Sequence, residues 1–257
     1  MTDELTRARD PHTPPAELQA LASHPDLAVR AALVSNPSCP RLTLEALLEQ
    51  AADDLATGRV LAEALLGNAS LLVWLLQEPT WLQRCPVKVA VALARSERAS
   101  DEVGQALSEH ASKRVRLWLG CAPGCSAEEA RRLVGVEGTV LDLSNEGLSA
   151  EDVRALVTWP GGADVTTLDL EGNQIGDAGA AALAQATSFP RLTTLYLWGN
   201  GIGDAGAAAL AQATSFSSLT TLYLSSNDIG PRGAQALADG PAFPQLITVL
   251  GRPRSRR

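Results

Sequence analysis

The sequence predicts an α and α/β fold in which a helical repeat array, an α-solenoid, is followed by a short α/β solenoid with a parallel stack of strands. One observation is that the segment 165–245 repeats nearly the same 27 residues three times, with equivalent leucines at Leu168, Leu195 and Leu222. The other is a fainter recurrence of short helix pairs in the first half. Periods of about 20 to 50 residues are typical of stacked repeats, whose units bury apolar side chains only against their neighbours.

Each 27-residue repeat divides into a strand, a turn and a helix. The first half, L-T-T-L-Y-L, alternates apolar and polar residues, which is typical of a short strand with one buried face. The second half, as in 177–186, is rich in alanine and leucine and lacks β-branched residues, so a helix is expected. The turn carries an asparagine whose amide can satisfy backbone groups at the bend, at Asn173, Asn200 and Asn227. The same step adds a first copy at Leu141 and a last strand at Val249.

The pattern L-x-x-L-x-L-x-x-N-x-I-G-x-x-G-A-x-x-L resembles leucine-rich repeats of the ribonuclease-inhibitor type, over about 138–250. The resemblance implies strands along the inside of a horseshoe and helices along its outside. The first copy departs from the pattern, with Glu146 in place of asparagine and Asp152 in place of the glycine found at Gly179, Gly206 and Gly233. Because terminal repeats cap a stack and are often atypical, we interpret this copy as a boundary repeat.

The first half predicts helices only. A helix is expected to begin after Thr13 at Pro14 and Pro15, and the stretch DLAVRAALVSNPSCPRLTLEALLEQ reads as two helices around a proline-containing break. That unit recurs in SKRVRLWLGCAPGCSAEEARRLV, with degenerate copies from Arg59 and from Val87. The sequence pattern V-R-x-x-L-x-x-N-P-x-x-P resembles that of the leucine-rich repeat variant family, whose helical repeats are similar in shape to HEAT repeats. No cysteine precedes Cys39, so the iron–sulfur segment of some members is not carried over.

The expected domains are a disordered segment 1–14, a helical repeat domain 15–137, a leucine-rich repeat domain 138–250 and a basic tail 251–257. The helical domain is expected to cover the N-terminal end of the strand stack, which would otherwise expose a sheet edge. The C-terminal strand edge has no capping helix after it. That edge is therefore a candidate for homo-oligomer formation, the alternative being a frayed strand shielded by Pro253 and the arginines.

Composition narrows the classes of function. The formal net charge of −8 excludes a general affinity for nucleic acid or for an anionic membrane, because both require a basic footprint. The single basic cluster is the short tail of Arg252, Arg254, Arg256 and Arg257, for which a weak electrostatic role is expected. No secretory signal pattern opens the chain and no long apolar run follows, so a soluble, cytoplasmic protein is expected.

The candidates for chemistry are few. Four cysteines are expected to be reduced thiols of a helical core, with a metal or disulfide role left as the alternative. His12, His24 and His110 are far apart in sequence and beside no candidate nucleophile, so neither catalysis, a metal nor a cofactor is expected. The stretch 201–206 matches G-x-G-x-x-G, but the other repeats do not preserve its first glycine, which excludes a dinucleotide fingerprint. Asp177 and Asp204 are interpreted as helix N-caps.

Function is expected on the strand face opposite the core. If Leu168 and Leu170 point inward, their neighbours point outward, because strand side chains alternate. The outward rows then read Asp142, Asp169, Tyr196, Tyr223 and Ser144, Glu171, Trp198, Ser225, an acidic edge beside an aromatic centre. Tyrosine and tryptophan are enriched among interface anchors. The predicted contacts to a protein partner with some basic character are Asp142, Thr167, Asp169, Glu171, Tyr196, Trp198, Tyr223 and Ser225.

A second hypothesis is a regulator of a small GTPase. Eukaryotic GTPase-activating proteins for Ran are similar to this repeat type, which implies an arginine that stabilises charge at the phosphates. The available arginines are Arg154, Arg191 and Arg232, and no local motif marks any of them.

Overall fold

The computed structural model describes residues 3–50, 55–68, 81–96, 99–241 and 248–249. The chain forms two compact units, Met1–Arg116 and Leu117–Arg257. The division falls inside helix α9 (Lys113–Gly120), ahead of the boundary expected near residue 137. The reason is that Leu117 in the second half of α9, together with Ala130 and Val134 of the next helix, belongs to the core of the repeats.

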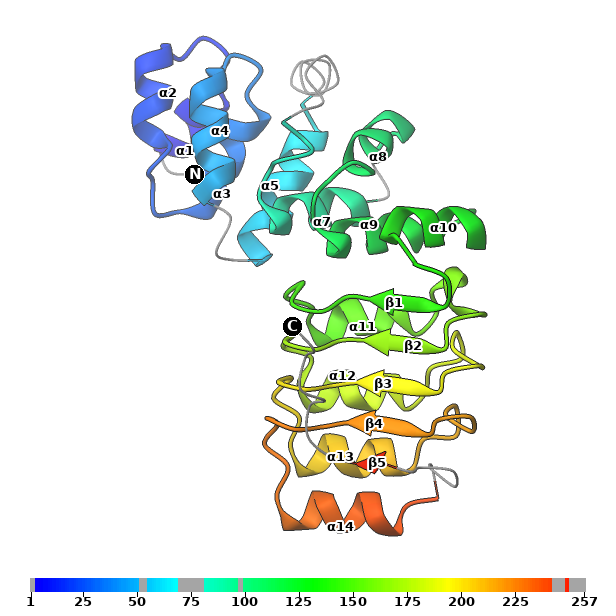
Figure 1. Cartoon of the computed structure of the whole chain (residues 1–257). Coiled ribbons are helices and arrows are strands. Elements are labelled where there is room, and N and C mark those ends of the chain that lie inside the picture. The colour runs from blue at the N-terminus through cyan, green and yellow to red at the C-terminus, as the bar shows by residue number, and fades with distance from the viewer. Residues whose placement is uncertain (1–2, 51–54, 69–80, 97–98, 242–247, 250–257) are drawn as a thin grey trace, which may run out of the picture. The chain divides into compact units, whose positions relative to one another are not determined.

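The described part of unit 1 is helical (Figure 1). Its helices are α1 (Asp3–Arg9), α2 (Pro15–Leu21), α3 (Leu27–Ser35), α4 (Arg41–Gln50), α5 (Leu55–Leu66), α7 (Val87–Arg95), α8 (Asp101–Leu107) and the first part of α9. Alternate helices pack in series, α1 on α3, α3 on α5 and α5 on α7, and α2, α4 and α8 each pack on the helix before them in the chain. The fully buried leucines of this series include Leu33, Leu61 and Leu93.

The recurring sequence pattern V-R-x-x-L-x-x-N has a physical cause. Val29 and Val115 are fully buried. The following arginine binds the loop before its own helix, with Arg30 Nη1 donating to His24 O at 2.6 Å and Arg116 Nη2 to Ala111 O at 3.5 Å. The asparagine slot joins neighbouring helices, because Asn36 Nδ2 donates to Ala8 O at 2.9 Å and Asn68 Nδ2 donates to Val34 O at 3.0 Å. Each repeat therefore satisfies backbone carbonyls in the repeat before it.

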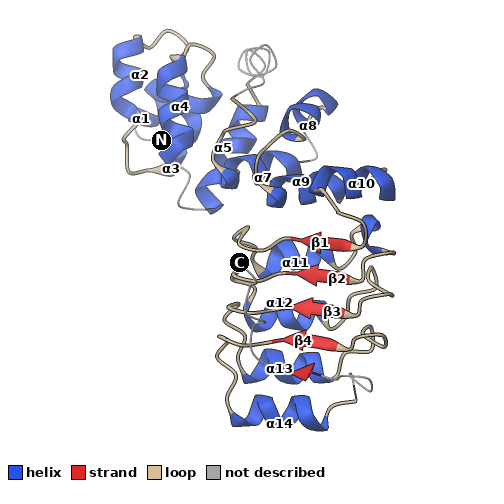
Figure 2. Cartoon of the chain, viewed as in Figure 1, coloured by secondary structure: helices blue, strands red, loops and turns tan. Residues whose placement is uncertain are grey.

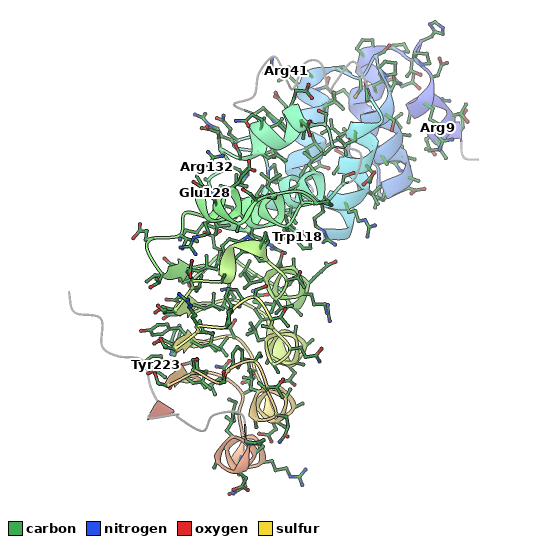
Figure 3. All side chains as sticks on the ribbon, turned by 90° about the vertical axis from the view of Figure 1, so that its right-hand side faces the viewer. Arg9, Arg41, Trp118, Glu128, Arg132 and Tyr223 are labelled. Carbon is green, nitrogen blue, oxygen red and sulfur yellow. The ribbon has the colours of Figure 1, made fainter. Side chains whose placement is uncertain are left out.

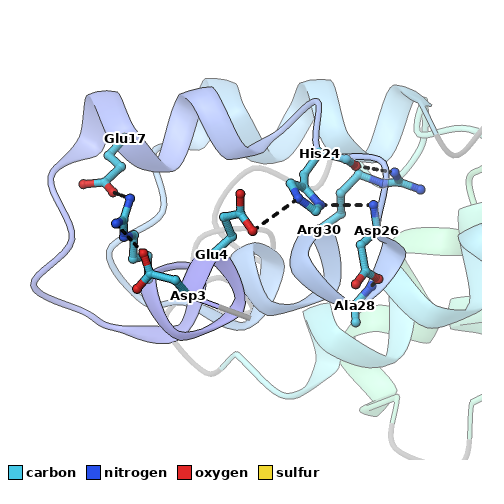
Figure 4. Close-up of polar contacts among 8 residues, drawn as sticks. Asp3, Glu4, Glu17, His24, Asp26, Ala28 and Arg30 are labelled. Carbon is cyan, nitrogen blue, oxygen red and sulfur yellow. Dashed lines mark hydrogen bonds and ion pairs between the residues drawn. The ribbon is translucent and has the colours of Figure 1, made fainter. Parts of the chain in front are cut away.

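The beginning of the chain corrects one expectation. Residues 3–9 form α1, whereas a disordered segment 1–14 was expected. Ala8 is fully buried, and Arg7 lies between Asp3 and Glu17, 3.1 Å from Glu17 Oε1 (Figure 4). The helix start expected at the two prolines is confirmed, since α2 begins at Pro15.

The described part of unit 2 contains the end of α9, helix α10 (Ala127–Val134) and the strands and helices of the repeats. The elements are β1 (Val140–Asp142), α11 (Ala150–Leu156), η2 (Pro160–Gly162), β2 (Thr167–Asp169), α12 (Gly176–Leu183), β3 (Thr194–Tyr196), α13 (Asp204–Ala211), β4 (Thr221–Tyr223), α14 (Pro231–Asp239) and β5 (Thr248–Val249). The strands form one parallel sheet in chain order, and consecutive helices pack side by side along it (Figure 2).

The register of the sheet follows the 27-residue step at every strand. Leu141, Leu168, Leu195, Leu222 and Val249 are successive partners across the sheet. The four leucines are fully buried, and Phe189 and Phe216, one repeat apart, are buried in the same core. Each buried leucine contributes about 1.5–3 kcal/mol, so the column of leucines is a main source of the stability of unit 2.

Within unit 2, Trp118 and Arg131 contact the first repeat. Trp118 of α9 donates from Nε1 to Asp152 Oδ1 at 2.8 Å, and Arg131 of α10 donates to Gly161 O at 3.0 Å. The other oxygen of Asp152 accepts from Ser149 N at 2.8 Å, which closes a capping box at the start of α11. The departure of Asp152 from the glycine of later repeats is thus explained by its bond to Trp118.

Candidate partner-binding face

A surface that we call the strand face is formed by the outward side chains of β1 to β4. It also includes the side chain two positions after the end of each of these strands. Its three rows run across the strands, and its members are Val140, Thr167, Thr194 and Thr221; Asp142, Asp169, Tyr196 and Tyr223; and Ser144, Glu171, Trp198 and Ser225. All twelve are half-buried or exposed, while the leucines between them are buried. Tyr223 points away from the helices of the repeats in Figure 3. The sequence-predicted contact residues therefore share one face.

The centre of the strand face is a pair of stacked tyrosines. The ring centroids of Tyr196 and Tyr223 are 4.6 Å apart and the ring planes differ by 8°. Burial raises the pKa of Tyr196, and the neighbouring Tyr223 and the carboxylate of Asp169 raise it further. Each ring restricts the other, so a partner would meet an aromatic surface whose rotamers are already ordered.

The acidic edge is held by local hydrogen bonds that sequence reasoning missed. Asp142 Oδ1 accepts from the backbone N–H of Ser144 at 2.9 Å and from its hydroxyl at 2.8 Å. Asp169 Oδ1 accepts from the N–H of Glu171 at 2.9 Å. These are aspartate turns at the ends of β1 and β2. They fix one oxygen of each carboxylate at the place where the chain leaves the sheet. The sequence feature that could have predicted them is the aspartate that directly follows the anchor leucine in each of the first two repeats.

The asparagines behind the strand face hold its turns together, as expected. Asn173 Nδ2 donates to Leu143 O at 3.0 Å and to Leu170 O at 2.8 Å, while its Oδ1 accepts from Leu148 N at 2.8 Å. Asn227 repeats the pattern one strand pair further on, with Leu197 O and Leu224 O as acceptors. Each amide therefore joins two neighbouring repeats, which stiffens the end of the strand face.

The middle asparagine departs from this pattern. Asn200 Nδ2 donates to Leu170 O at 2.8 Å, but its Oδ1 is buried and meets no donor among the described residues. The adjacent turn differs as well, because Gly176 has a φ of +57° and donates to Asn200 O at 3.0 Å. The equivalent Gly203 and Gly230 have φ values of −99° and −89°. Only glycine adopts such a positive φ readily, which is why this turn is tolerated here.

Asp177 and Asp204 cap helices, but not the helices in which they stand. Asp177 Oδ1 accepts from Gly203 N at 2.7 Å and from Gly206 N at 2.8 Å, at the start of α13. Asp204 makes the same two contacts at the start of α14, at 2.7 and 2.8 Å. The two aspartates are helix caps, as expected, but each caps the helix of the next repeat and not its own helix. Each carboxylate stabilises the N-terminus of the following helix through its unpaired N–H groups and its dipole.

The cysteines and His110 lie in mostly buried surroundings. All four cysteines are free. Burial raises the pKa of Cys39, Cys85 and Cys121 to about 12, so these thiols stay protonated and are poor nucleophiles at neutral pH. His110 is buried, with Nε2 3.0 Å from Cys85 O and Nδ1 accepting from Ser112 N at 3.1 Å. The described ranges contain no group of three or more histidine, cysteine and acidic side chains that would hold a metal ion.

The three arginines of the GTPase hypothesis are spread over different repeats. Arg154 stands in α11, Arg232 in α14, and Arg191 in the loop before β3. Arg191 Nη1 forms an exposed ion pair with Asp164 at 3.1 Å. The glycines of 201–206 serve the turn into α13, with Gly201 at a φ of +66°.

The fold and its outward rows define unit 2 as an array of strand–helix repeats with an open strand face. A family model described as Leucine Rich repeat matches the chain three times, at residues 164–184, 191–211 and 217–238. These matches cover the second to fourth strands and the helices that follow them, and they support a leucine-rich repeat protein. A search of curated proteins gave no match. Within the described segments, no helix has the length and apolarity needed to cross a bilayer.

Proposed function

We propose that this chain is a non-enzymatic interaction module that presents its strand face to a protein partner with basic character. The observation that carries the proposal is the stacked pair Tyr196 and Tyr223 beside the carboxylates of Asp169 and Asp142, all on one row of the sheet. A face with only a scaffolding role would be expected to stay polar, whereas aromatic side chains bury much area for few rotors when a partner docks.

The rest of the architecture supports rigid presentation. Leucine-rich repeats generally mediate protein–protein interaction, and stacked repeats provide extended binding surfaces. Three kinds of contact fix the turns that follow the strands. These are the aspartate turns, the asparagine side chains, and the carboxylates of one repeat that cap the helix of the next. A surface fixed in this way loses little conformational entropy on binding.

The finer assignments are proposals as well. We infer that the repeats of unit 2 are of the ribonuclease-inhibitor type and that the helices of unit 1 form an α-solenoid of the variant or HEAT-like type. The support is the serial packing of α1, α3, α5 and α7 and the shared asparagine contacts. A cytoplasmic location and self-association through the C-terminal strand edge belong to the same proposal.

The test is affinity capture from lysate of the source cells with three matched baits. These are the wild type, the strand-face variant Tyr196→Ala/Trp198→Ala, and the control Gln185→Ala/Gln212→Ala, whose two exposed glutamines lie at the C-terminal ends of α12 and α13. We expect one or more proteins bound by the wild type and the control and lost with the strand-face variant. Higher salt should weaken that capture, because the carboxylates contribute by charge. Equal capture by all three baits would refute the proposal.

The second candidate function, a regulator of a small GTPase, requires a single arginine that reaches the phosphates. A measurement of GTP hydrolysis by candidate small GTPases, with and without this chain, tests it. An acceleration that is lost in the Arg191→Ala variant would replace the present proposal.

A further inference from the structure

The stack of aromatic rings on the strand face ends beside an aspartate. Tyr223 is the register partner of Tyr196 on one side, and Asp169 is its register partner on the other. We infer that this end of the stack binds an arginine side chain of the protein partner. The guanidinium lies flat on Tyr196 and donates to the carboxylates of Asp169 and Glu171. The inference rests on the proposed function, because it names the side chain by which a basic partner binds the same face.

The geometry of the tyrosine pair directs one ring face toward Asp169. The two ring centroids are 4.6 Å apart and the ring planes differ by 8°. Neighbouring strands are about 4.8 Å apart, so the stack runs across the sheet from strand to strand. Tyr223 therefore covers one face of the Tyr196 ring, and the opposite face is directed toward β2. A planar cation over Asp169 would continue the stack at about the same spacing, within the roughly 6 Å at which a ring attracts a cation.

Asp169 itself covers little of that ring face. An aspartate side chain is shorter than a tyrosine side chain, so it ends nearer to the sheet. Its Oδ1 also accepts from the backbone N–H of Glu171 at 2.9 Å, which holds the carboxylate at the end of β2. Tyr196 is only half-buried, although a second ring lies against it. The outer part of the Tyr196 ring therefore remains for a ligand, with a carboxylate at its base.

The charge of the surface requires a cation. The charged members of the strand face are Asp142, Asp169 and Glu171, and all three are acidic. A carboxylate accepts several hydrogen bonds, so an oxygen already used in a local turn does not prevent a further donor from binding. The partner group must therefore be positively charged and must carry N–H donors.

The combination of ring and carboxylate favours arginine over lysine. A guanidinium is planar, so it can lie on an aromatic ring while its N–H groups point along its own plane to a carboxylate. An ammonium group is a compact point charge that cannot stack, and it is more strongly hydrated. The strand face should therefore discriminate between two side chains of equal charge.

Three peptides test this discrimination. Each is acetylated and amidated and has the sequence Gly-Xaa-Gly-Xaa-Gly, where Xaa is arginine, lysine or citrulline, the last being planar but uncharged. Each is titrated into the full-length protein by calorimetry at low ionic strength. We expect the arginine peptide to bind at least about tenfold more tightly than the lysine peptide, because only arginine gains the stacking contact. The citrulline peptide should bind more weakly than the arginine peptide, because it lacks the charge.

Variants of the two contact residues separate stacking from charge. Tyr196→Leu should reduce the preference for arginine over lysine to less than about twofold, and Tyr196→Phe, which keeps the ring, should retain most of it. Asp169→Asn should weaken both cationic peptides, while its amide oxygen can still accept from the backbone in the turn. Gln185→Ala/Gln212→Ala should bind as the wild type does. Urea unfolding of each variant shows that the binding change is not a loss of fold.

Four results would overturn the inference. The lysine peptide could bind the wild type as tightly as the arginine peptide does, or none of the peptides could bind. The preference for arginine could also survive in Tyr196→Leu, or the affinity for arginine could be unchanged in Asp169→Asn. Any of these results would leave the proposed function standing if affinity capture still gave a partner that the strand-face variant loses. Conversely, arginine selectivity as predicted, without a captured partner that depends on the strand face, would refute the proposed function alone.

Discussion

At the scale of single residues, three asparagines in equivalent slots differ in what they bind. Asn173 and Asn227 use both ends of the amide, whereas no described donor reaches Oδ1 of Asn200. The sequence shows three identical residues at the same step. The difference arises from the turn at Gly176, whose backbone conformation the repeat pattern does not specify.

The asparagine slots should therefore differ in stability. Asn173→Ala leaves Leu143 O, Leu170 O and Leu148 N without their side-chain partner, and we expect a loss of about 3 kcal/mol in the free energy of unfolding. Asn200→Ala should lose about 1 kcal/mol less, because no bond to Oδ1 is broken. Urea unfolding followed by circular dichroism measures both. An Asn200→Ala variant as unstable as Asn173→Ala would contradict the assignment.

The tyrosine pair should be visible in a pH titration. The chain has only two tyrosines, so tyrosinate absorbance reports on the pair alone. We expect the pKa of Tyr196 to lie above the ordinary value of 10.0, and Tyr223→Phe to bring it closer to that value by removing one cause of the shift. Because the folded state holds the proton more tightly, the stabilisation is complete below the unfolded pKa and is lost as pH rises through the folded pKa. An unchanged Tyr196 titration in Tyr223→Phe would show that the rings do not interact.

At the scale of elements, helices and strands depend on the repeat before them. Asp177 in α12 caps α13, and Asp204 in α13 caps α14. The glycine at the third position of the capped helix is then required, because a Cβ at Gly206 would lie 2.6 Å from Asp177 Oδ1 and 2.9 Å from Asp177 Cα. In the first repeat the position equivalent to Gly206 is Asp152. Its carboxylate binds Trp118 and caps its own helix α11.

Two glycine-to-alanine changes in helices separate this effect from helix propensity. Gly206→Ala in α13 must displace backbone of α12, and we expect a net loss of about 1–3 kcal/mol despite the better helix propensity of alanine. Gly104→Ala in α8 meets nothing within 4 Å and should be neutral or stabilise the protein by up to about 1 kcal/mol. The free energy of unfolding of each variant decides the matter. Equal effects at the two positions would remove the steric account of the glycine.

Much of the fold could be predicted from the sequence, and the limits have physical causes. The strands, their register and the outward rows follow from an exact step of 27 residues with alternating polarity, and the sheet obeys that step from Leu141 to Val249. The helix in which a carboxylate acts could not be predicted, since Asp177 was assigned to its own helix. The contact between the first repeat and the helix before it could not be predicted either. The partner of Asp152 is Trp118, 34 residues away in a helix with a different sequence pattern.

At the scale of the whole molecule, the acidic repeat array carries the tyrosine pair on its strand face. The tyrosines and the carboxylates were predicted to share a face, and the register brings them together; their role toward a partner stays a prediction. The proposed function assigns this surface to a protein partner with basic character.

The most direct test of the account is the affinity of a captured partner for three full-length proteins, measured by calorimetry together with their unfolding free energies. We expect Tyr196→Ala/Trp198→Ala to weaken binding at least about a hundredfold, or about 2.7 kcal/mol, because both anchors are lost. Its stability should fall by only about 1–2 kcal/mol, as both side chains are half-buried, and Gln185→Ala/Gln212→Ala should bind as the wild type does. A strand-face variant that binds as tightly as the control would show that the partner docks elsewhere on the molecule.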